Sequence, residues 1–235
     1  MLLIALIRTL SAVVFLVLYS VLLGPIFILQ AVLSNSVRLL YPFCVGGAQI
    51  GLRIAGVTPH VEGLENIPPG VCLFVSNHAS NVDPPVIIGR IPGRVALLAK
   101  REVFRIPLLG AAMRLGRFIP VNRRDPAAAR ASVRLARKYM KEGISYLIFA
   151  EGTRSRDGSL GEFKRGSFLL AIESGAPVVP ITIVGTRAIL PRGAFLIRPG
   201  IARVIFHPPV NVSADTPATR KDLAEHVRST IASAL

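Results

Sequence analysis

A histidine and an aspartate stand five residues apart in the segment Asn77-His78-Ala79-Ser80-Asn81-Val82-Asp83. A carboxylate that accepts a hydrogen bond from one imidazole nitrogen fixes the tautomer of the ring and leaves the other nitrogen free to take a proton. The segment follows the short apolar run Val71–Val75, which predicts that the pair lies in a loop after a buried strand. The spacing therefore predicts a general base, His78, oriented by Asp83.

The two serines that flank His78 are not placed as nucleophiles. Ser76 and Ser80 lie outside the Gly-x-Ser-x-Gly elbow that exposes the catalytic serine of many hydrolases. We therefore expect His78 to act directly on a substrate hydroxyl, without a covalent intermediate. The other three histidines and the two cysteines are scattered along the chain, which argues against a metal site.

The composition favours a membrane partner over nucleic acid. The 235-residue chain has a formal charge of +15, which favours phosphate-bearing ligands or an anionic membrane surface. Hydrophobic residues make up 51% of the chain, and nucleic-acid-binding modules are seldom so apolar. A membrane enzyme that handles phosphates fits both observations.

The N-terminal segment is predicted to enter a membrane. No residue from Thr9 to Val37 is charged, and about 20 apolar residues suffice for a helix to cross a bilayer. Gly24-Pro25 interrupts this run, and a proline favours a kink or a break. Two arrangements fit: a single tilted transmembrane helix, or a hairpin in which residues 2–23 and 26–55 dip into one leaflet. We favour the hairpin because it keeps both ends on the basic, cytoplasmic side.

The pattern divides the chain into a membrane-anchoring segment, residues 1–55, and an α/β catalytic domain, residues 56–235. In the second part, apolar runs typical of strands alternate with helical segments. The expected strands are 57–61, 71–75, 94–99, 145–149, 178–184 and 203–206, and the expected helices are 83–89, 125–142, 166–174 and one from 216. This alternation predicts a mixed, largely parallel sheet flanked by helices, with ligand sites beyond the carboxyl ends of its strands.

Four segments occur in an order that resembles the glycerolipid acyltransferase superfamily. They are Asn-His-x4-Asp at 77–83, Phe-Ile-x-Val-x-Arg at 118–123, Glu-Gly-Thr-Arg-Ser at 151–155 and Val-Pro-Ile at 179–181. The later run from Leu190 to Val210 is most similar to the 1-acylglycerol-3-phosphate acyltransferases. The resemblance covers about residues 56–212.

The resemblance implies transfer of a fatty acyl group from a thioester, on acyl carrier protein or coenzyme A, to the sn-2 hydroxyl of lysophosphatidic acid, giving phosphatidic acid. In that reaction His78 is the base and Asp83 orients it, and no cofactor is needed beyond the acyl donor. Backbone N–H groups near the His78 loop or Gly152 are the expected donors to the tetrahedral oxyanion. The expected location is the inner membrane of the cell, with the catalytic domain on the cytoplasmic side.

The acceptor's phosphate requires cations, because arginine binds phosphate as a bidentate fork and lysine as a point charge. We expect Arg154 to be the first such ligand, followed by Arg123 and then Lys100. Glu151 cannot bind phosphate, so we expect it to hold Arg154 or to contact the glycerol hydroxyl. The predicted substrate-binding residues are Glu151, Gly152, Thr153, Arg154, Arg123 and Lys100.

A basic face is predicted on the helix within residues 126–142. Its cations recur at spacings of three and four residues and therefore share one side of the helix: Arg130, Arg134, Arg137, Lys138 and Lys141. This face is either a charged solvent surface or a docking site for anionic lipid headgroups or for an acidic carrier protein.

Three other functions remain open on the sequence. One is a related acyltransferase that acts on glycerol-3-phosphate or a lyso-aminolipid, and another is a hydrolase in which His78 activates water. The third is a non-catalytic membrane-binding scaffold. The His78/Asp83 pair and Arg154 argue against the scaffold, which needs none of them.

Overall fold

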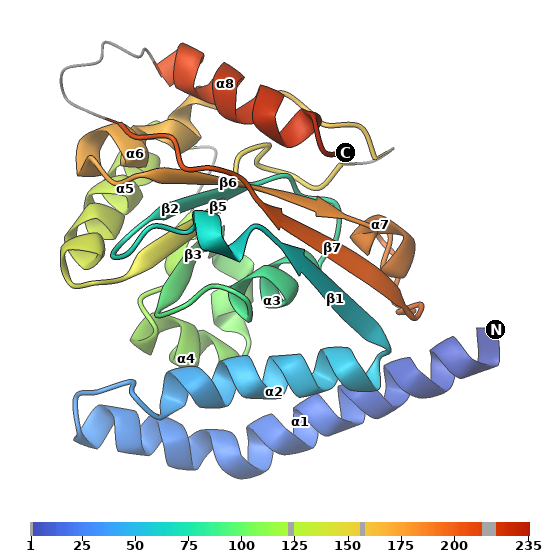
Figure 1. Cartoon of the computed structure of the whole chain (residues 1–235). Helices are drawn as coiled ribbons and strands as arrows, with labels where there is room; N and C mark the ends of the chain where they lie inside the picture. Colours follow the sequence, from blue (N-terminus) through green and yellow to red (C-terminus); the bar gives the residue numbers. More distant parts are fainter. Residues whose placement is uncertain (1, 122–124, 156–157, 213–219) are drawn as a thin grey trace.

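A central sheet carries helices on both faces, and two N-terminal helices lie side by side along one of these faces (Figure 1). The structure is a computed structural model that describes residues 2–121, 125–155, 158–212 and 220–235. The predicted phosphate ligand Arg123 lies outside the described residues, as does the predicted start of the last helix at residue 216.

The described part of the chain forms a seven-stranded sheet of mixed direction. Its strands are β1 (Val57–Glu62), β2 (Leu73–Ser76), β3 (Val95–Lys100), β4 (Ile119–Val121), β5 (Ser145–Phe149), β6 (Val178–Val184) and β7 (Gly200–Phe206). They pair in the order β1-β7-β6-β2-β5-β3-β4, and within the described residues only the β6–β7 pair is antiparallel. The prediction of a mixed, largely parallel sheet is therefore confirmed.

The α-helices of the described residues are α1 (Leu2–Leu33), α2 (Leu40–Ile54), α3 (Asp83–Ile88), α4 (Leu109–Leu115), α5 (Pro126–Lys141), α6 (Leu169–Ser174), α7 (Thr186–Ile189) and α8 (Arg220–Ala232). Short 3-10 turns cover Leu64–Asn66, Arg101–Arg105 and Arg165–Phe168. The start of α5 follows from local chemistry, because the Asp125 side chain accepts hydrogen bonds from the N–H groups of Ala127 and Ala128.

The sheet separates two apolar clusters. Successive residues of a strand point to opposite faces, so Phe74 packs toward α2 and α3 with Leu52 and Ile87. Its neighbour Val75 belongs to the cluster on the other face, which α5, α6 and α8 cover. All four residues of β2 are buried, as expected for a parallel strand that is covered on both faces.

The N-terminal segment is a two-helix hairpin, but the predicted position of its turn is wrong. α1 continues through Pro25 to Leu33, so the break expected at Gly24-Pro25 lies about ten residues too early. Contacts with α2 hold α1 on both sides of the proline: the rings of Tyr19 and Phe27 stack on Phe43 with centroid distances of 4.4 and 4.2 Å. A proline removes a single intrahelical hydrogen bond, and helix packing compensates for it here by a bend rather than a break (Figure 1).

The hairpin has both an apolar outer surface and an inner face that belongs to the core. α1 is long and apolar enough to cross a membrane, and most of its large apolar side chains are exposed. On the inner face, Ala12 and Leu52 are buried in the same cluster as Phe74 of β2. α2 ends at Ile54 and β1 begins at Val57, so residues 55 and 56 join the hairpin to the sheet.

Candidate active site

The loops that carry the predicted chemistry meet at one edge of the sheet. β2 lies between β5 and β6 and is parallel to both, so the segments after these three strands emerge together. The segment after β2 contains His78, the one after β5 contains Glu151, and the one after β6 leads into α7. Ligand sites of parallel sheets lie beyond the carboxyl ends of the strands, and His78 and Glu151 both lie there.

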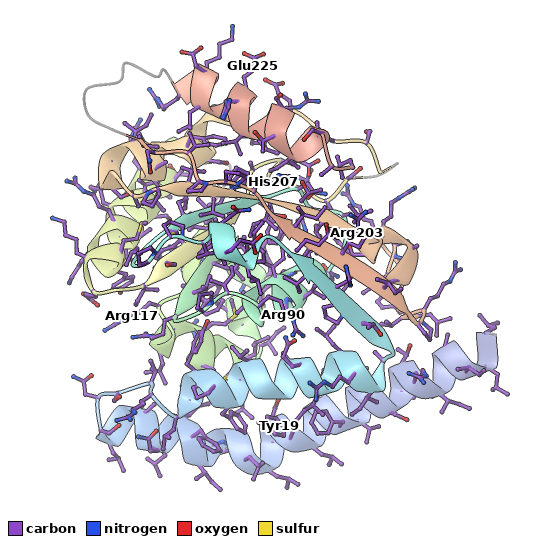
Figure 2. The ribbon with its side chains drawn as sticks, viewed as in Figure 1. Tyr19, Arg90, Arg117, Arg203, His207 and Glu225 are labelled. Atoms are coloured by element: carbon purple, nitrogen blue, oxygen red, sulfur yellow. The ribbon has the colours of Figure 1, made fainter. Side chains whose placement is uncertain are left out.

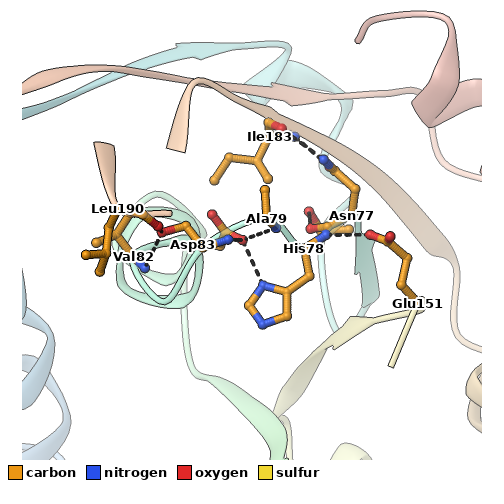
Figure 3. Close-up of polar contacts among 10 residues, drawn as sticks. Asn77, His78, Ala79, Val82, Asp83, Glu151, Ile183 and Leu190 are labelled. Carbon is orange, nitrogen blue, oxygen red and sulfur yellow. Dashed lines mark hydrogen bonds and ion pairs between the residues drawn. The ribbon is translucent and has the colours of Figure 1, made fainter. Parts of the chain in front are cut away.

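The imidazole of His78 and the carboxylate of Asp83 form the pair that their spacing predicts. The distance from His78 Nδ1 to Asp83 Oδ2 is 2.7 Å, and the Asp83 side chain is fully buried. The His78 side chain keeps 16% of its surface exposed, so a substrate can reach the ring. Its ring stacks on Phe149, the last residue of β5, with the centroids 4.0 Å apart. The Nε2 atom has no hydrogen-bond partner among the described residues and points away from Asp83 (Figure 3).

Asp83 also closes the loop that carries His78. Its Oδ2 atom accepts hydrogen bonds from the N–H groups of Ala79 and Ser80, each at 2.8 Å. Asp83 is the first residue of α3 and is followed by Pro84, a sequence that favours a helix start. Three donors therefore converge on one carboxylate oxygen, and they fix the loop, the helix start and the ring as one unit.

Glu151 supports the same loop from the neighbouring strand. Its Oε1 atom accepts a hydrogen bond from His78 N at 2.8 Å (Figure 3). Its Oε2 atom accepts one from Gly161 N at 3.0 Å. The sequence interpretation placed this carboxylate on Arg154 or on the glycerol hydroxyl. The structure differs: Glu151 is buried and forms no ion pair with a described residue. Both of its carboxylate oxygens accept hydrogen bonds from backbone N–H groups instead.

The polar side chains next to His78 are also engaged with backbone. The Asn77 amide donates to Ile183 O at 2.9 Å and accepts from Ile183 N at 2.8 Å, which ties the loop to β6. The buried hydroxyls of Ser76 and Ser80 donate to the carbonyl groups of Asn77 and Leu190. Neither hydroxyl is exposed, so the geometry agrees with a direct attack that needs no serine nucleophile.

The Glu-Gly-Thr-Arg segment turns sharply past the histidine. Gly152 has a φ of +74°, which a side chain rarely tolerates, and a Cβ atom there would lie 3.0 Å from the Lys164 side chain. Thr153 is exposed and Arg154 is half-buried. The next residue, Ser155, contacts the His78 loop, because its N–H donates to His78 O at 2.9 Å. This bond places Arg154 beside the His78 loop.

Two cations near this segment were missed by the sequence interpretation of the site. Lys164 lies over Gly152 because Lys164 N donates to Ala150 O and closes the intervening loop. Arg192 donates from Nη1 to Arg154 O at 3.1 Å. Arg192 belongs to the Leu-Pro-Arg-Gly run that contributed to the resemblance, which was the available signal for it. A single lysine thirteen positions after Glu151 gives no such signal.

Lys100 is at the same edge of the sheet but farther from the dyad. It is the exposed last residue of β3, which is two strands away from β2 in the sheet order. At about 4.8 Å per strand, Lys100 begins about 10 Å from the His78 loop. Its side chain forms no ion pair with a described residue, so it is free to move toward a substrate.

The fold and the site geometry match a known protein family. The family model described as Acyltransferase matches residues 58–184, which include the His78/Asp83 pair, the Glu151–Arg154 segment and six of the seven strands. This match covers more than half of the chain, and the chain belongs to that family.

Within the family, the similar proteins are 1-acyl-sn-glycerol-3-phosphate acyltransferases, and the chain belongs to this group. A chloroplastic member from Brassica napus is 39% identical over 64% of this chain and 44% of its own length. A member from Borreliella burgdorferi is 32% identical over 78% of this chain and 74% of its own length. The crystal structure of the Thermotoga maritima enzyme PlsC, described as a 1-acyl-sn-glycerophosphate acyltransferase, has a TM-score of 0.82, with 26% identity over 98% of this chain and 95% of that one.

Proposed function

We propose that this protein transfers an acyl group from a thioester donor to the sn-2 hydroxyl of lysophosphatidic acid and that His78 is the general base. The observation that carries the proposal is the buried His78–Asp83 pair, with Nε2 unengaged among the described residues at the carboxyl edge of the sheet. The names of the related proteins support this acceptor.

The reaction is balanced by one proton that moves through His78. Nε2 takes the proton of the acceptor hydroxyl as its oxygen attacks the thioester carbonyl, and Asp83 stabilises the imidazolium that forms. The tetrahedral intermediate then collapses with cleavage of the carbon–sulfur bond. The departing thiolate receives the proton from His78, which restores the neutral imidazole.

The developing oxyanion requires N–H donors that the fold has not already used. The N–H groups of His78, Ala79 and Ser80 donate to carboxylates, and the N–H of Gly152 donates to Phe149 O. In the described part of the chain, the N–H groups of Thr153 and Arg154 have no acceptor. We assign the oxyanion to these two groups, because donors that are free and fixed in place stabilise it without reorganisation.

The acceptor's phosphate is assigned to the cations at the same edge. Arg154 is the principal ligand because Ser155 ties it to the His78 loop. Arg192 and Lys164 lie against the same segment. Arg123 and Lys100 remain further candidate ligands from the sequence.

The hairpin and α5 suit two different partners. The exposed apolar surface of α1 suits a bilayer, and we propose attachment to the inner membrane with the catalytic domain on the cytoplasmic side. α5 packs on the opposite face of the sheet, and its five cations are all exposed. That position favours a soluble anionic partner, so we assign the basic face of α5 to the acyl donor, acyl carrier protein or coenzyme A.

The decisive measurement is acyl transfer by the purified protein and by His78→Gln, with lysophosphatidic acid, glycerol-3-phosphate and a lyso-aminolipid as acceptors and with both donor types. We expect phosphatidic acid from the first acceptor only, and loss of turnover in a variant whose thermal unfolding is unchanged. Turnover by folded His78→Gln would overturn the mechanism. Release of free fatty acid at the same rate without any acceptor would indicate a hydrolase instead.

A further inference from the structure

A basic cavity that the reaction does not use lies where the hairpin joins the sheet. Its volume is about 620 Å³, and it is lined by Arg8 of α1, Arg53 of α2 and Arg90 after α3, together with the start of β1 and Pro199. No carboxylate lines it. Three arginines that face one cavity without an acidic neighbour offer positive charge and N–H donors to an anion from outside the chain.

Arg8 is held at the cavity by its own helix. Its neighbour Thr9 accepts a hydrogen bond from Ile197 N at 2.9 Å through Oγ1, which ties α1 to the loop before β7. The guanidinium of Arg8 passes over Gly56, where a Cβ atom would lie 2.5 Å from Nη1, and Gly56 has a φ of +79°. A glycine at the joint between α2 and β1 therefore leaves the space that Arg8 occupies.

Arg90 is fixed in a different way. Its Nη2 atom donates to Gln49 Oε1 at 2.8 Å, and Gln49 in turn donates to Pro85 O at 2.7 Å, so the side chain is held between α2 and the sheet (Figure 2). The Nε–H of Arg90 is buried without an acceptor in the described structure. Arg8 and Arg53 are exposed and form no hydrogen bond or ion pair with a described residue. All three side chains thus retain donors for an incoming anion.

The position of the cavity excludes the phosphate of the reacting acceptor. β1 and β7 begin at the edge where His78 lies, but β1 is three strands from β2 in the sheet order, or about 14 Å away. In lysophosphatidic acid the phosphate is on the carbon next to the reacting hydroxyl. One molecule cannot place its hydroxyl on His78 and its phosphate in this cavity.

We propose that the cavity binds the phosphate group of a bilayer phospholipid and so sets how the catalytic domain sits on the membrane. The proposal rests on the membrane attachment proposed above. Arg8 is the last charge before the uncharged stretch that starts at Thr9, and Arg53 is one residue before the end of α2. Both therefore lie where the apolar hairpin ends and the polar domain begins, which is the level of the phosphate layer. A bidentate guanidinium fork matches a phosphate there.

The test is the sedimentation of full-length protein with vesicles of anionic phospholipid and with vesicles of uncharged lipid, using Arg8→Gln/Arg53→Gln. The matched control is Arg134→Gln/Arg137→Gln, which removes the same charge from α5 on the far face of the sheet. We expect the first variant to lower partitioning to anionic vesicles roughly 30-fold, from about 1 kcal/mol for each arginine at the surface, and the control less than about threefold. Arg8→Lys/Arg53→Lys should also bind more weakly than the wild type, since a lysine lacks the fork.

Equal losses for the pocket variant and the α5 control, or wild-type binding by the lysine variant, would overturn the proposal in favour of general charge attraction. Adenosine 3′,5′-bisphosphate provides the second arm: if it binds the wild type but not Arg8→Gln/Arg53→Gln while vesicle binding is unchanged, the cavity serves the soluble donor and the lipid proposal is wrong. Turnover with detergent-dispersed substrates should be the same in the wild type, in Arg8→Gln/Arg53→Gln and in Arg8→Lys/Arg53→Lys. If the wild type binds neither kind of vesicle, the membrane attachment itself fails.

Discussion

The loop after β2 and the loop after β5 both contribute to the site, but they differ in how much of their polar surface is already bound. In the first loop, the Asn77 amide, the His78 Nδ1 atom and the Asp83 Oδ2 atom are all paired within the protein. In the second loop, Glu151 is fully engaged, whereas the Thr153 and Arg154 N–H groups and the Lys164 ammonium are left without partners in the described structure. In the proposed mechanism, the fold therefore fixes the group that moves the proton and leaves unpaired the groups that would meet substrate charge.

The largest effect is expected from breaking the first loop at Asp83. In Asp83→Asn the amide can donate to His78 Nδ1, which places the ring proton on Nε2 and removes the base. We expect kcat to fall roughly 10⁴-fold, the size of the effect that the wrong tautomer has in the Ser-His-Asp triad. Steady-state kinetics at saturating acceptor measure this, with circular dichroism as the control for folding. A fall in kcat of less than tenfold would contradict the proposal that Asp83 sets the tautomer of the base in the first loop.

The second loop should respond through substrate affinity rather than turnover. Arg154→Ala removes a charge-assisted contact to the phosphate, for which about 1.5–3 kcal/mol corresponds to a rise in the acceptor KM of roughly 10- to 100-fold. We expect kcat to change much less, because the interaction is the same in the ground state and the transition state. Arg134→Ala on α5 is the matched control and should leave the acceptor KM unaltered. An equal fall in kcat would instead place Arg154 on the reacting centre.

A smaller effect on kcat is expected from Arg228 of α8, which contacts the segment that supports Glu151. Arg228 donates from Nε to Gly161 O and from Nη2 to Leu160 O, both at 3.1 Å, and Gly161 N donates to the carboxylate that holds His78. We expect Arg228→Ala to lower kcat about fivefold, since a net hydrogen bond contributes about 1 kcal/mol. The acceptor KM should stay constant, and Arg228→Lys should recover part of the loss. A change in KM alone would contradict this path to His78.

The smallest effect is expected at His207, a histidine outside both loops that makes the stability of the fold depend on pH. His207 lies beneath α8 (Figure 2), and its Nε2 atom is 2.8 Å from Thr182 Oγ1. Burial lowers the pKa of His207 below its ordinary value. The unfolded chain therefore takes up this proton at a higher pH than the folded chain does, and stability is lost as pH falls below about 6.5. His207→Gln should have a smaller drop in Tm between pH 7.5 and 5.5 than the wild type has, which thermal unfolding at both pH values measures.

Local patterns were sufficient for most of the sheet and for the dyad. β2, β5 and β6 are continuous apolar runs because both of their faces are covered, and the His78–Asp83 pairing depends on residues five positions apart. The three-residue strand β4 and helix α4 were not predicted. β4 is defined by its pairing with β3, which no local pattern encodes.

The role of Glu151 and the turn of the hairpin were missed for the same reason. The local sequence suggests that Glu151 pairs with Arg154, three positions away. Its hydrogen-bond partners are instead backbone N–H groups 73 and 10 positions away. The local sequence suggests that Pro25 breaks the helix. However, Tyr19 and Phe27, on either side of the proline, both stack on Phe43 of α2, and α1 stays continuous. In both cases a contact between distant segments outweighs the preference of the residue itself.

The burial of Ala12 and Leu52 in the same cluster as Phe74 has a practical consequence for anyone who wants this protein in water. Deleting the first 55 residues would expose one face of the sheet and produce an insoluble remnant instead of a soluble domain. The alternative is to keep both helices and replace only the outward apolar side chains of α1, such as Leu10, Val14 and Val21, with polar ones. A variant that retains the hairpin but has these polar surface residues on α1 should be soluble in water and keep the structure of the His78 and Glu151 loops.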